Sequence, residues 1–254
     1  MNALATASIV TRDRVRDDIV AGKLPLGSRL TLDLLAARYA VGHMPIREAL
    51  RQLEGEGLVV LAPNRCARVR AVDVGFAQNI FDLRMAIEAM LTRRAAERIE
   101  RAQLTRLRTV QARFEVHARR LDFVRLLALN REFHDVINEV AANPEAAEVL
   151  ARHWRVITAL WNLHGYGEQR VAGVISDHRQ IIDALAAHDA EAAASLAITH
   201  AAKAKQALTM RMLEREAAAS RETPRTRPVG TRAARKASPK PNNRRHRASL
   251  RARV

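Results

Sequence analysis

Four residues in the second half of the chain carry side chains that can bind a metal and could meet in the folded protein: Asn130, His134, His178 and His200. Asn130 and His134 are four residues apart, so on a helix they share one face. Imidazole is the commonest protein ligand for zinc, nickel and similar ions, and three imidazoles leave positions open for water or a ligand carboxylate. The chain holds nine histidines, however, and spacing alone favours unrelated polar residues over a metal site.

A second group of polar residues lines one side of a predicted helix that begins near His43 and ends at Gly57. Pro45 fits there because proline is tolerated in the first turn of a helix. Apolar residues then recur at helical spacing, at Ile46, Ala49, Leu50 and Leu53. The other side carries His43, Met44, Arg47, Arg51 and Gln52. An arginine fork pairs with guanine O6 and N7 or clamps a phosphate, so this face suits DNA recognition.

The elements around this helix have the order of a winged helix-turn-helix. A helix over residues 8–21 precedes a turn-rich loop, and a second helix is predicted from about Thr31 to Tyr39. Residues 58–61 and 67–71 are predicted to form two short strands around a tight hairpin. In such a motif the third helix enters the major groove. Pattern alone leaves open a small helical domain with solvated arginines.

The same region resembles the GntR family of bacterial regulators. Residues 44–69, MPIREALRQLEGEGLVVLAPNRCARV, follow the family's core of P-[VI]-R-E-A-L and a later L-x-x-E-G-L. Upstream, LPLGSRL at residues 24–30 matches the family's loop before the second helix. The resemblance implies that Arg47 contacts DNA, that Arg29 contacts phosphate, and that the wing tip reaches phosphate or the minor groove. The predicted DNA-binding residues are Arg29, His43, Met44, Pro45, Arg47, Arg51, Asn64 and Arg65.

Three positions depart from the family pattern. His43 stands where an arginine is frequent, which leaves the base preference at this contact open. Gly42 stands where a serine is frequent, so we expect no side-chain N-cap before the third helix. Cys66, the only cysteine, replaces a common wing glycine. A lone surface thiol is usually inert, and a redox switch at Cys66 is the less favoured interpretation.

From Asp73 onward glycine and proline become rare, and amphipathic segments follow one another. Helices are predicted over 73–98, 103–119, 122–141, 144–164, 168–187 and 190–216, which indicates an all-helical bundle. Residues 129–144 and 177–200 closely resemble the sensor domain of the FadR subgroup of the GntR family. Many members bind a divalent metal through an acidic or amide residue and three histidines. The matching positions are Asn130, His134, His178 and His200.

Two details qualify what this resemblance implies for the site. Asn130 replaces the more typical aspartate, and a neutral amide oxygen is a weaker metal ligand than a carboxylate. Arg84, in FDLRMAIE, stands where the family often directs an arginine toward the effector. Together with the metal, its guanidinium would bind an organic acid. An ordinary surface pair of Arg84 with Glu88, at helical spacing, is an equal alternative, and a pocket that uses these groups without metal also stays open.

Composition agrees with a mainly helical fold, because Ala, Leu, Glu and Arg abound and aromatic residues make up 4%. The predicted parts are a winged helix-turn-helix at 1–71, a helical sensor bundle at 72–218 and a disordered basic tail at 219–254. The net charge is +16, and the last part carries most of it. Such a tail would add salt-sensitive affinity for DNA or be dispensable. No stretch approaches 18 apolar residues, so no membrane association is expected.

The sequence therefore predicts a cytoplasmic homodimer that binds double-stranded operator DNA and senses a small organic acid near a divalent metal such as zinc or nickel. By default we expect a repressor whose repression is relieved when the effector binds. The chain has no Gly-x-Ser-x-Gly elbow, no phosphate-binding Gly-Lys-Ser loop and no His-Glu-x-x-His helix, so no enzymatic activity is expected. A metal-dependent enzyme and a non-specific architectural nucleic-acid binder are the alternatives.

Overall fold

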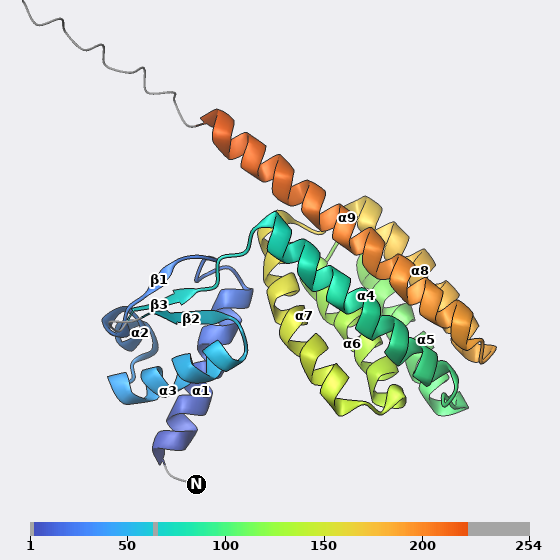
Figure 1. Ribbon diagram of the computed structural model, residues 1–254, viewed down its shortest axis with the longest axis horizontal. Helices are drawn as coiled ribbons and strands as arrows, with labels where there is room; N and C mark the ends of the chain where they lie inside the picture. Colours follow the sequence, from blue (N-terminus) through green and yellow to red (C-terminus); the bar gives the residue numbers. More distant parts are fainter. Residues whose placement is uncertain (1–2, 63–65, 223–254) are drawn as a thin grey trace, which may run out of the picture.

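The computed structural model describes residues 3–62 and 66–222. Its N-terminal part places three helices around a small antiparallel sheet (Figure 1). The central strand, β3, pairs with both β1 and β2, and Leu30 aligns with Ala67 in the register of β1 on β3. The elements are α1 (Ala3–Val20), β1 (Arg29–Leu30), α2 (Leu32–Tyr39), α3 (His43–Gly55), β2 (Val59–Ala62) and β3 (Cys66–Val69).

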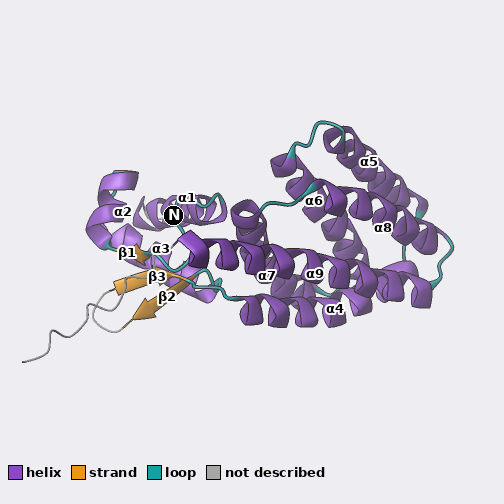
Figure 2. Cartoon of the chain, turned by 90° about the horizontal axis from the view of Figure 1, so that it is seen from above, coloured by secondary structure: helices purple, strands orange, loops and turns teal. Residues whose placement is uncertain are grey.

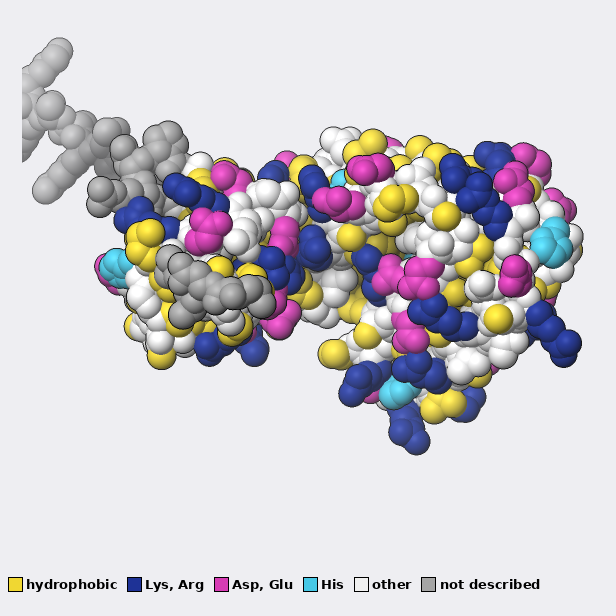
Figure 3. All heavy atoms as spheres, turned by 90° about the horizontal axis from the view of Figure 1, so that it is seen from below, with side chains coloured by type: hydrophobic (Ala, Val, Ile, Leu, Met, Phe, Trp, Pro, Cys, Tyr) yellow, Lys and Arg dark blue, Asp and Glu magenta, His cyan; other side chains and the backbone are white. Residues whose placement is uncertain are grey.

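The C-terminal part is a bundle of helices, and the figures show the two parts as separate lobes (Figures 2 and 3). The longest helix, α9, runs beside α4 and extends past the rest of the bundle (Figure 1). In the described part of the chain, no helix is both long and apolar enough to cross a membrane. The helices are α4 (Val74–Ala96), α5 (Arg101–Ala118), α6 (Phe123–Ala141), α7 (Pro144–His164), α8 (Glu168–Ala186) and α9 (Ala190–Glu222).

Local sequence signals explain where several helices begin. The Thr31 hydroxyl accepts a hydrogen bond from the Leu34 amide at 3.2 Å, and the Asp73 carboxylate accepts one from Phe76 at 2.7 Å. Each bond satisfies a backbone donor that a helix N-terminus leaves unpaired. Gly42 provides no side-chain cap to α3, as its sequence predicts. The recognition helix candidate is therefore fixed by its buried apolar face rather than by its cap.

The predicted mainly helical fold, with an N-terminal winged helix-turn-helix and a helical bundle, is confirmed. Three details differ from the sequence prediction by more than the one or two residues over which helix ends vary. Helix α1 begins at Ala3 instead of residue 8. Strand β1 was not predicted, because two residues are too short to show a period of two. Helix α9 continues to Glu222, beyond the predicted end at 216 and through the predicted boundary at 219. The predicted contacts Asn64 and Arg65, and the predicted tail beyond residue 222, lie outside the described residues.

Candidate metal and DNA-binding sites

Three helices bring three predicted histidines together inside the bundle. His134 lies on α6, His178 on α8 and His200 on α9, and each contributes a potential ligand nitrogen within 4.8 Å of the other two. The Nε2 atoms of His134 and His200 are 3.3 Å apart. Zn–N bonds of about 2.0–2.1 Å at tetrahedral angles place two ligating nitrogens roughly 3.4 Å apart. The observed separation therefore fits two imidazoles facing one ion.

Hydrogen bonds to neighbouring side chains orient two of these rings. His178 donates through Nδ1 to the Gln111 Oε1 atom at 2.9 Å, and His200 donates through Nδ1 to the Asp177 Oδ2 atom at 3.1 Å. The Lys203 ammonium in turn donates a hydrogen bond to the Asp177 Oδ1 atom at 2.6 Å, which fixes the position of this carboxylate. A partner on Nδ1 leaves Nε2 as the ligating atom and fixes the ring orientation. The sequence prediction missed Gln111 and Asp177, since their contacts with the rings depend on how the helices pack.

Asn130 has the burial and the free atom that a fourth ligand needs. Its side chain is 4% exposed, and it precedes His134 by one helical turn on α6. Among residues 3–62 and 66–222, its Oδ1 has no hydrogen-bond partner, and neither does His178 Nε2. Leaving such groups unpaired in the interior costs roughly 1–3 kcal/mol each. A cation bound by these atoms would satisfy both, so the residues present fit a divalent metal.

Burial keeps the three imidazoles in the neutral form that binds metal. It lowers the pKa of His134 and of His178 well below 6.5, and repulsion from the charged form of His200 adds to this. Burial also lowers the pKa of His200 to about 4, although the hydrogen bond to Asp177 acts in the opposite direction. A neutral ring offers its lone pair without first losing a proton. The cluster is therefore ready for an ion at neutral pH.

Arg84 is buried beside this cluster, and its pairing with Glu88 is not a surface contact. Both side chains are nearly inaccessible, and Arg84 donates through Nε and Nη2 to Glu88 Oε1 at 2.8 and 2.6 Å. Its guanidinium lies over the Trp154 ring, 4.1 Å from the centroid, and that ring is 5.4 Å from the ring of His134. The i,i+4 spacing correctly indicates the pair, but the alternative that placed this pair on the protein surface is wrong.

The predicted DNA-binding residues divide between the two faces of α3. His43, Met44, Arg47 and Arg51 are exposed, whereas Pro45 is buried on the core side, so its predicted DNA contact is not available. Arg29 is exposed on β1, where it aligns with Arg68 of β3. The exposed Arg68 was not predicted, and it places a second guanidinium beside Arg29. Paired cations of this kind suit phosphate oxygens.

Comparisons with known proteins match both halves of the chain. Residues 8–69 match the family described as bacterial regulatory proteins, gntR family, and residues 79–203 match the FCD domain. The HTH-type transcriptional regulator YdhC of Bacillus subtilis is 23% identical over 190 residues, which are 74% of this chain and 84% of YdhC. The transcriptional repressor GlaR of Escherichia coli is 38% identical over 84 residues, which are 33% of this chain and 38% of GlaR.

A solved structure shows the same fold over most of the chain. Escherichia coli McbR/YncC superposes with a TM-score of 0.69 at 20% identity and covers 85% of this chain and 100% of that protein. The matched family and the relatives found are transcriptional regulators, not enzymes. The chain belongs to the GntR family of bacterial transcriptional regulators, as a member with a C-terminal FCD domain.

Proposed function

We propose that this protein is a homodimeric repressor whose FCD domain controls operator binding through a divalent metal and a small organic acid. The observation that carries the proposal is the convergence of three buried imidazoles on one point in the bundle. Each of the three comes from a different helix, so an ion bound there would link α6, α8 and α9 at one point. Metal and effector would then favour one arrangement of the bundle.

Operator binding is assigned to the exposed face of α3. Arg47 lies in the second turn of α3, and Arg51 follows one turn later on the same exposed side. These positions suit base and phosphate contacts from the exposed face of a recognition helix. Two copies related by a two-fold axis would bind a palindrome, since operator symmetry mirrors dimer symmetry. Arg29 and Arg68 would add phosphate contacts beside the helix.

The metal is assigned to Asn130, His134, His178 and His200. One amide oxygen and three imidazole nitrogens suit zinc, nickel and similar ions. When bound, the ion supplies a positive charge that attracts a carboxylate. The protein's own contribution is to hold neutral rings in place, through Gln111 and Asp177, and to exclude water from the cluster. The FCD assignment of residues 79–203 supports the metal and the effector alike.

The effector is assigned to the neighbourhood of the metal ligands and Arg84. Glu88 already occupies two donors of Arg84, so an incoming carboxylate must compete with Glu88 for the guanidinium. That competition favours a small acid that the metal binds at the same time. Only a difference in the acid's affinity for two arrangements of the protein shifts operator binding. Relatives such as GlaR are named repressors, which supports relief of repression by the effector.

Replacing Asn130 with aspartate is expected to tighten zinc binding by roughly tenfold or more. The substitution keeps the size of the side chain, adds a negative charge, and brings the site to the more usual carboxylate ligand. Isothermal titration of the metal-free protein with zinc measures the change. Asn138→Asp, on the same helix but outside the predicted ligands, is the matched control. Equal zinc affinities for the parent and Asn130→Asp would remove Asn130 from the ligand set.

Metal analysis of the purified protein tests the assignment as a whole. We expect about one zinc or nickel ion per chain, because a site built from three imidazoles and one amide binds a single ion. Removing the ion with a chelator is expected to change operator affinity, and adding zinc should restore it. A protein that contains no metal, and that zinc does not stabilise, would overturn the metal part of the proposal while leaving the DNA-binding part intact.

A further inference from the structure

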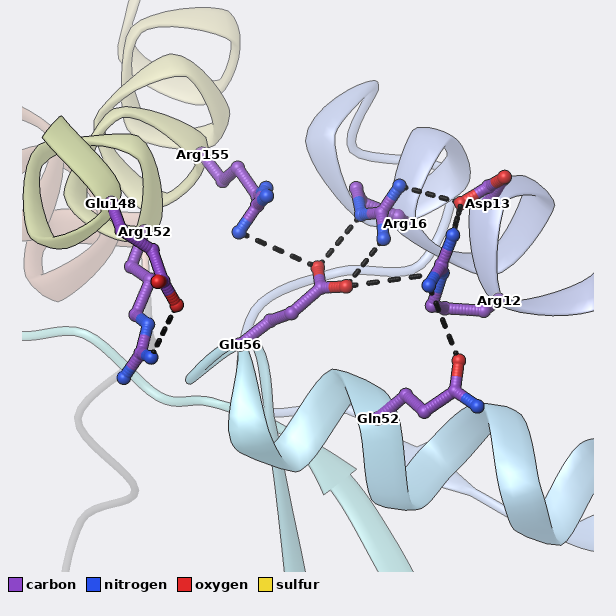
Figure 4. Close-up of polar contacts among 8 residues, drawn as sticks. All are labelled: Arg12, Asp13, Arg16, Gln52, Glu56, Glu148, Arg152 and Arg155. Atoms are coloured by element: carbon purple, nitrogen blue, oxygen red, sulfur yellow. Dashed lines mark hydrogen bonds and ion pairs between the residues drawn. The ribbon is translucent and has the colours of Figure 1, made fainter. Parts of the chain in front are cut away.

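Glu56, the residue that follows α3, forms ion pairs with arginines from both lobes of the molecule (Figure 4). From α1, Arg16 donates through Nε to Glu56 Oε2 at 2.7 Å and also pairs with Oε1. Arg12, also from α1, lies with its Nε 3.9 Å from Oε1. From α7 of the FCD domain, Arg155 reaches Oε2 with its Nη1 at 3.6 Å. One carboxylate is thus shared between three guanidiniums.

These pairs are shielded from water more than ordinary surface pairs are. The Glu56 side chain is 17% exposed, and that of Arg155 is 32% exposed. Burial lowers the pKa of Arg155; Glu56 acts against this, and the nearby Arg16 adds to it. Arg16 lies closest to the carboxylate, at 2.7 Å, whereas Arg155 is 3.6 Å away, so the Arg155 pair is weaker than the Arg16 pair. A small displacement of α7 would therefore break or tighten it without disturbing the α1 pairs.

Helix α7 reaches the sensor core through the residue next to Arg155. Trp154 packs its ring 5.4 Å from the ring of His134 and lies under the guanidinium of Arg84. Two turns further along α7, the Asn162 side-chain amide donates to the Val20 carbonyl, at the last residue of α1, at 2.8 Å. The same helix thus contacts the metal cluster on one side and the DNA-binding domain at two points on the other.

Within the DNA-binding domain, Glu56 and Arg12 both contact the recognition helix α3 directly. The Glu56 backbone N–H donates to the Gln52 carbonyl and so closes the last turn of α3. Arg12 donates to the Gln52 side chain at 3.3 Å, which ties the exposed side of α3 to α1. A displacement of Glu56 therefore also displaces the C-terminal end of α3 and alters the contact of α3 with α1.

We infer that Arg155 and Glu56 are positioning residues that couple the metal cluster to the recognition helix, with α7 as the connecting element. The inference rests on the proposed metal site, because the sensor end of the coupling is the contact of Trp154 with His134. Binding of an ion at His134 shifts the packing of α7, and the Arg155–Glu56 pair conveys the shift to α3. Such coupling requires an element with two arrangements, and the equilibrium between them must depend on both sites.

Hydrogen exchange of the full-length protein, with and without zinc, tests this coupling. Zinc is expected to change amide exchange roughly two- to fivefold in peptides covering residues 50–60 and 15–24, the range that one partly shielded ion pair provides. Arg155→Gln should abolish this zinc-dependent change and leave zinc affinity, measured by isothermal titration, unaltered. Glu56→Gln should abolish it too, from the DNA-binding side of the contact.

Arg152→Gln is the matched control, because Arg152 lies on the same helix and pairs with Glu148 at 2.8 Å instead of Glu56 (Figure 4). It should keep the full zinc response. If zinc binds to the parent protein and amide exchange in the two peptides stays the same, the coupling is overturned. The metal assignment would not be affected by that result. A response that persists in Arg155→Gln would also overturn it. Failure of the parent to bind zinc would overturn the metal assignment and this coupling together.

Discussion

Replacing Arg47 with alanine is expected to weaken sequence-specific operator binding about 100-fold or more, because a good bidentate contact to a base contributes about 1–3 kcal/mol and a dimer loses two of them. Arg47 is exposed on α3 and lies outside the buried face that holds the helix. The free energy of unfolding should therefore change by less than about 0.5 kcal/mol. Fluorescence anisotropy with an operator duplex measures the affinity, and thermal melting measures the stability.

Arg108→Ala is a suitable control for that experiment, since Arg108 is an exposed arginine on α5 of the FCD domain. It removes the same charge from the protein without touching α3. Its operator affinity is expected to stay within about threefold of the parent's at physiological salt. An Arg47→Ala protein that gives the parent's footprint at the parent's concentration would refute the assignment of α3 as the recognition helix.

Replacing His134 with alanine is expected to remove both the bound metal and the stabilisation that the metal provides. An ion that binds only the native state at 100 times its dissociation constant adds about 2.7 kcal/mol. For a protein of this size that corresponds to a rise in melting temperature of roughly 5–10 °C. The quantity to compare is the zinc-dependent rise in each protein, since loss of a buried ring also destabilises the metal-free state.

His117→Ala is the control for metal binding, because His117 lies on α5 outside the cluster and pairs with Asp122. It should retain the metal content and the zinc-dependent rise of the parent. If His134→Ala contained as much zinc as the parent and gained as much in melting temperature on adding it, the three histidines would have to be reassigned as core polar residues.

The elements of the fold were predictable because their signals are local. The apolar periodicity of residues 43–57 and the turn residues around it indicated the winged helix-turn-helix, which the structure contains. The same reasoning missed β1, whose two residues are held by pairing with β3 rather than by their own pattern. It also included Pro45 among the DNA contacts, although the first turn of α3 directs that ring to the core.

The candidate metal site was predictable only in part, because it depends on how the helices pack. The resemblance to FCD sensors identified His134, His178 and His200, and the structure brings them together. Spacing within one helix could not identify Gln111, which meets His178 across 67 positions in sequence. Nor could it show that the Arg84–Glu88 pair is buried, since an i,i+4 spacing does not say which face of a helix meets the core.

The most direct test of the central claim is a selection of genomic DNA fragments by the purified full-length protein at physiological salt. The selection is run with zinc and again with a chelator, and the fragments are sequenced. The proposed function predicts one or a few sites that share a palindromic motif, with an enrichment that changes when the metal is removed. Recovery of fragments without a shared motif, equal in both conditions, would contradict a metal-controlled, sequence-specific regulator.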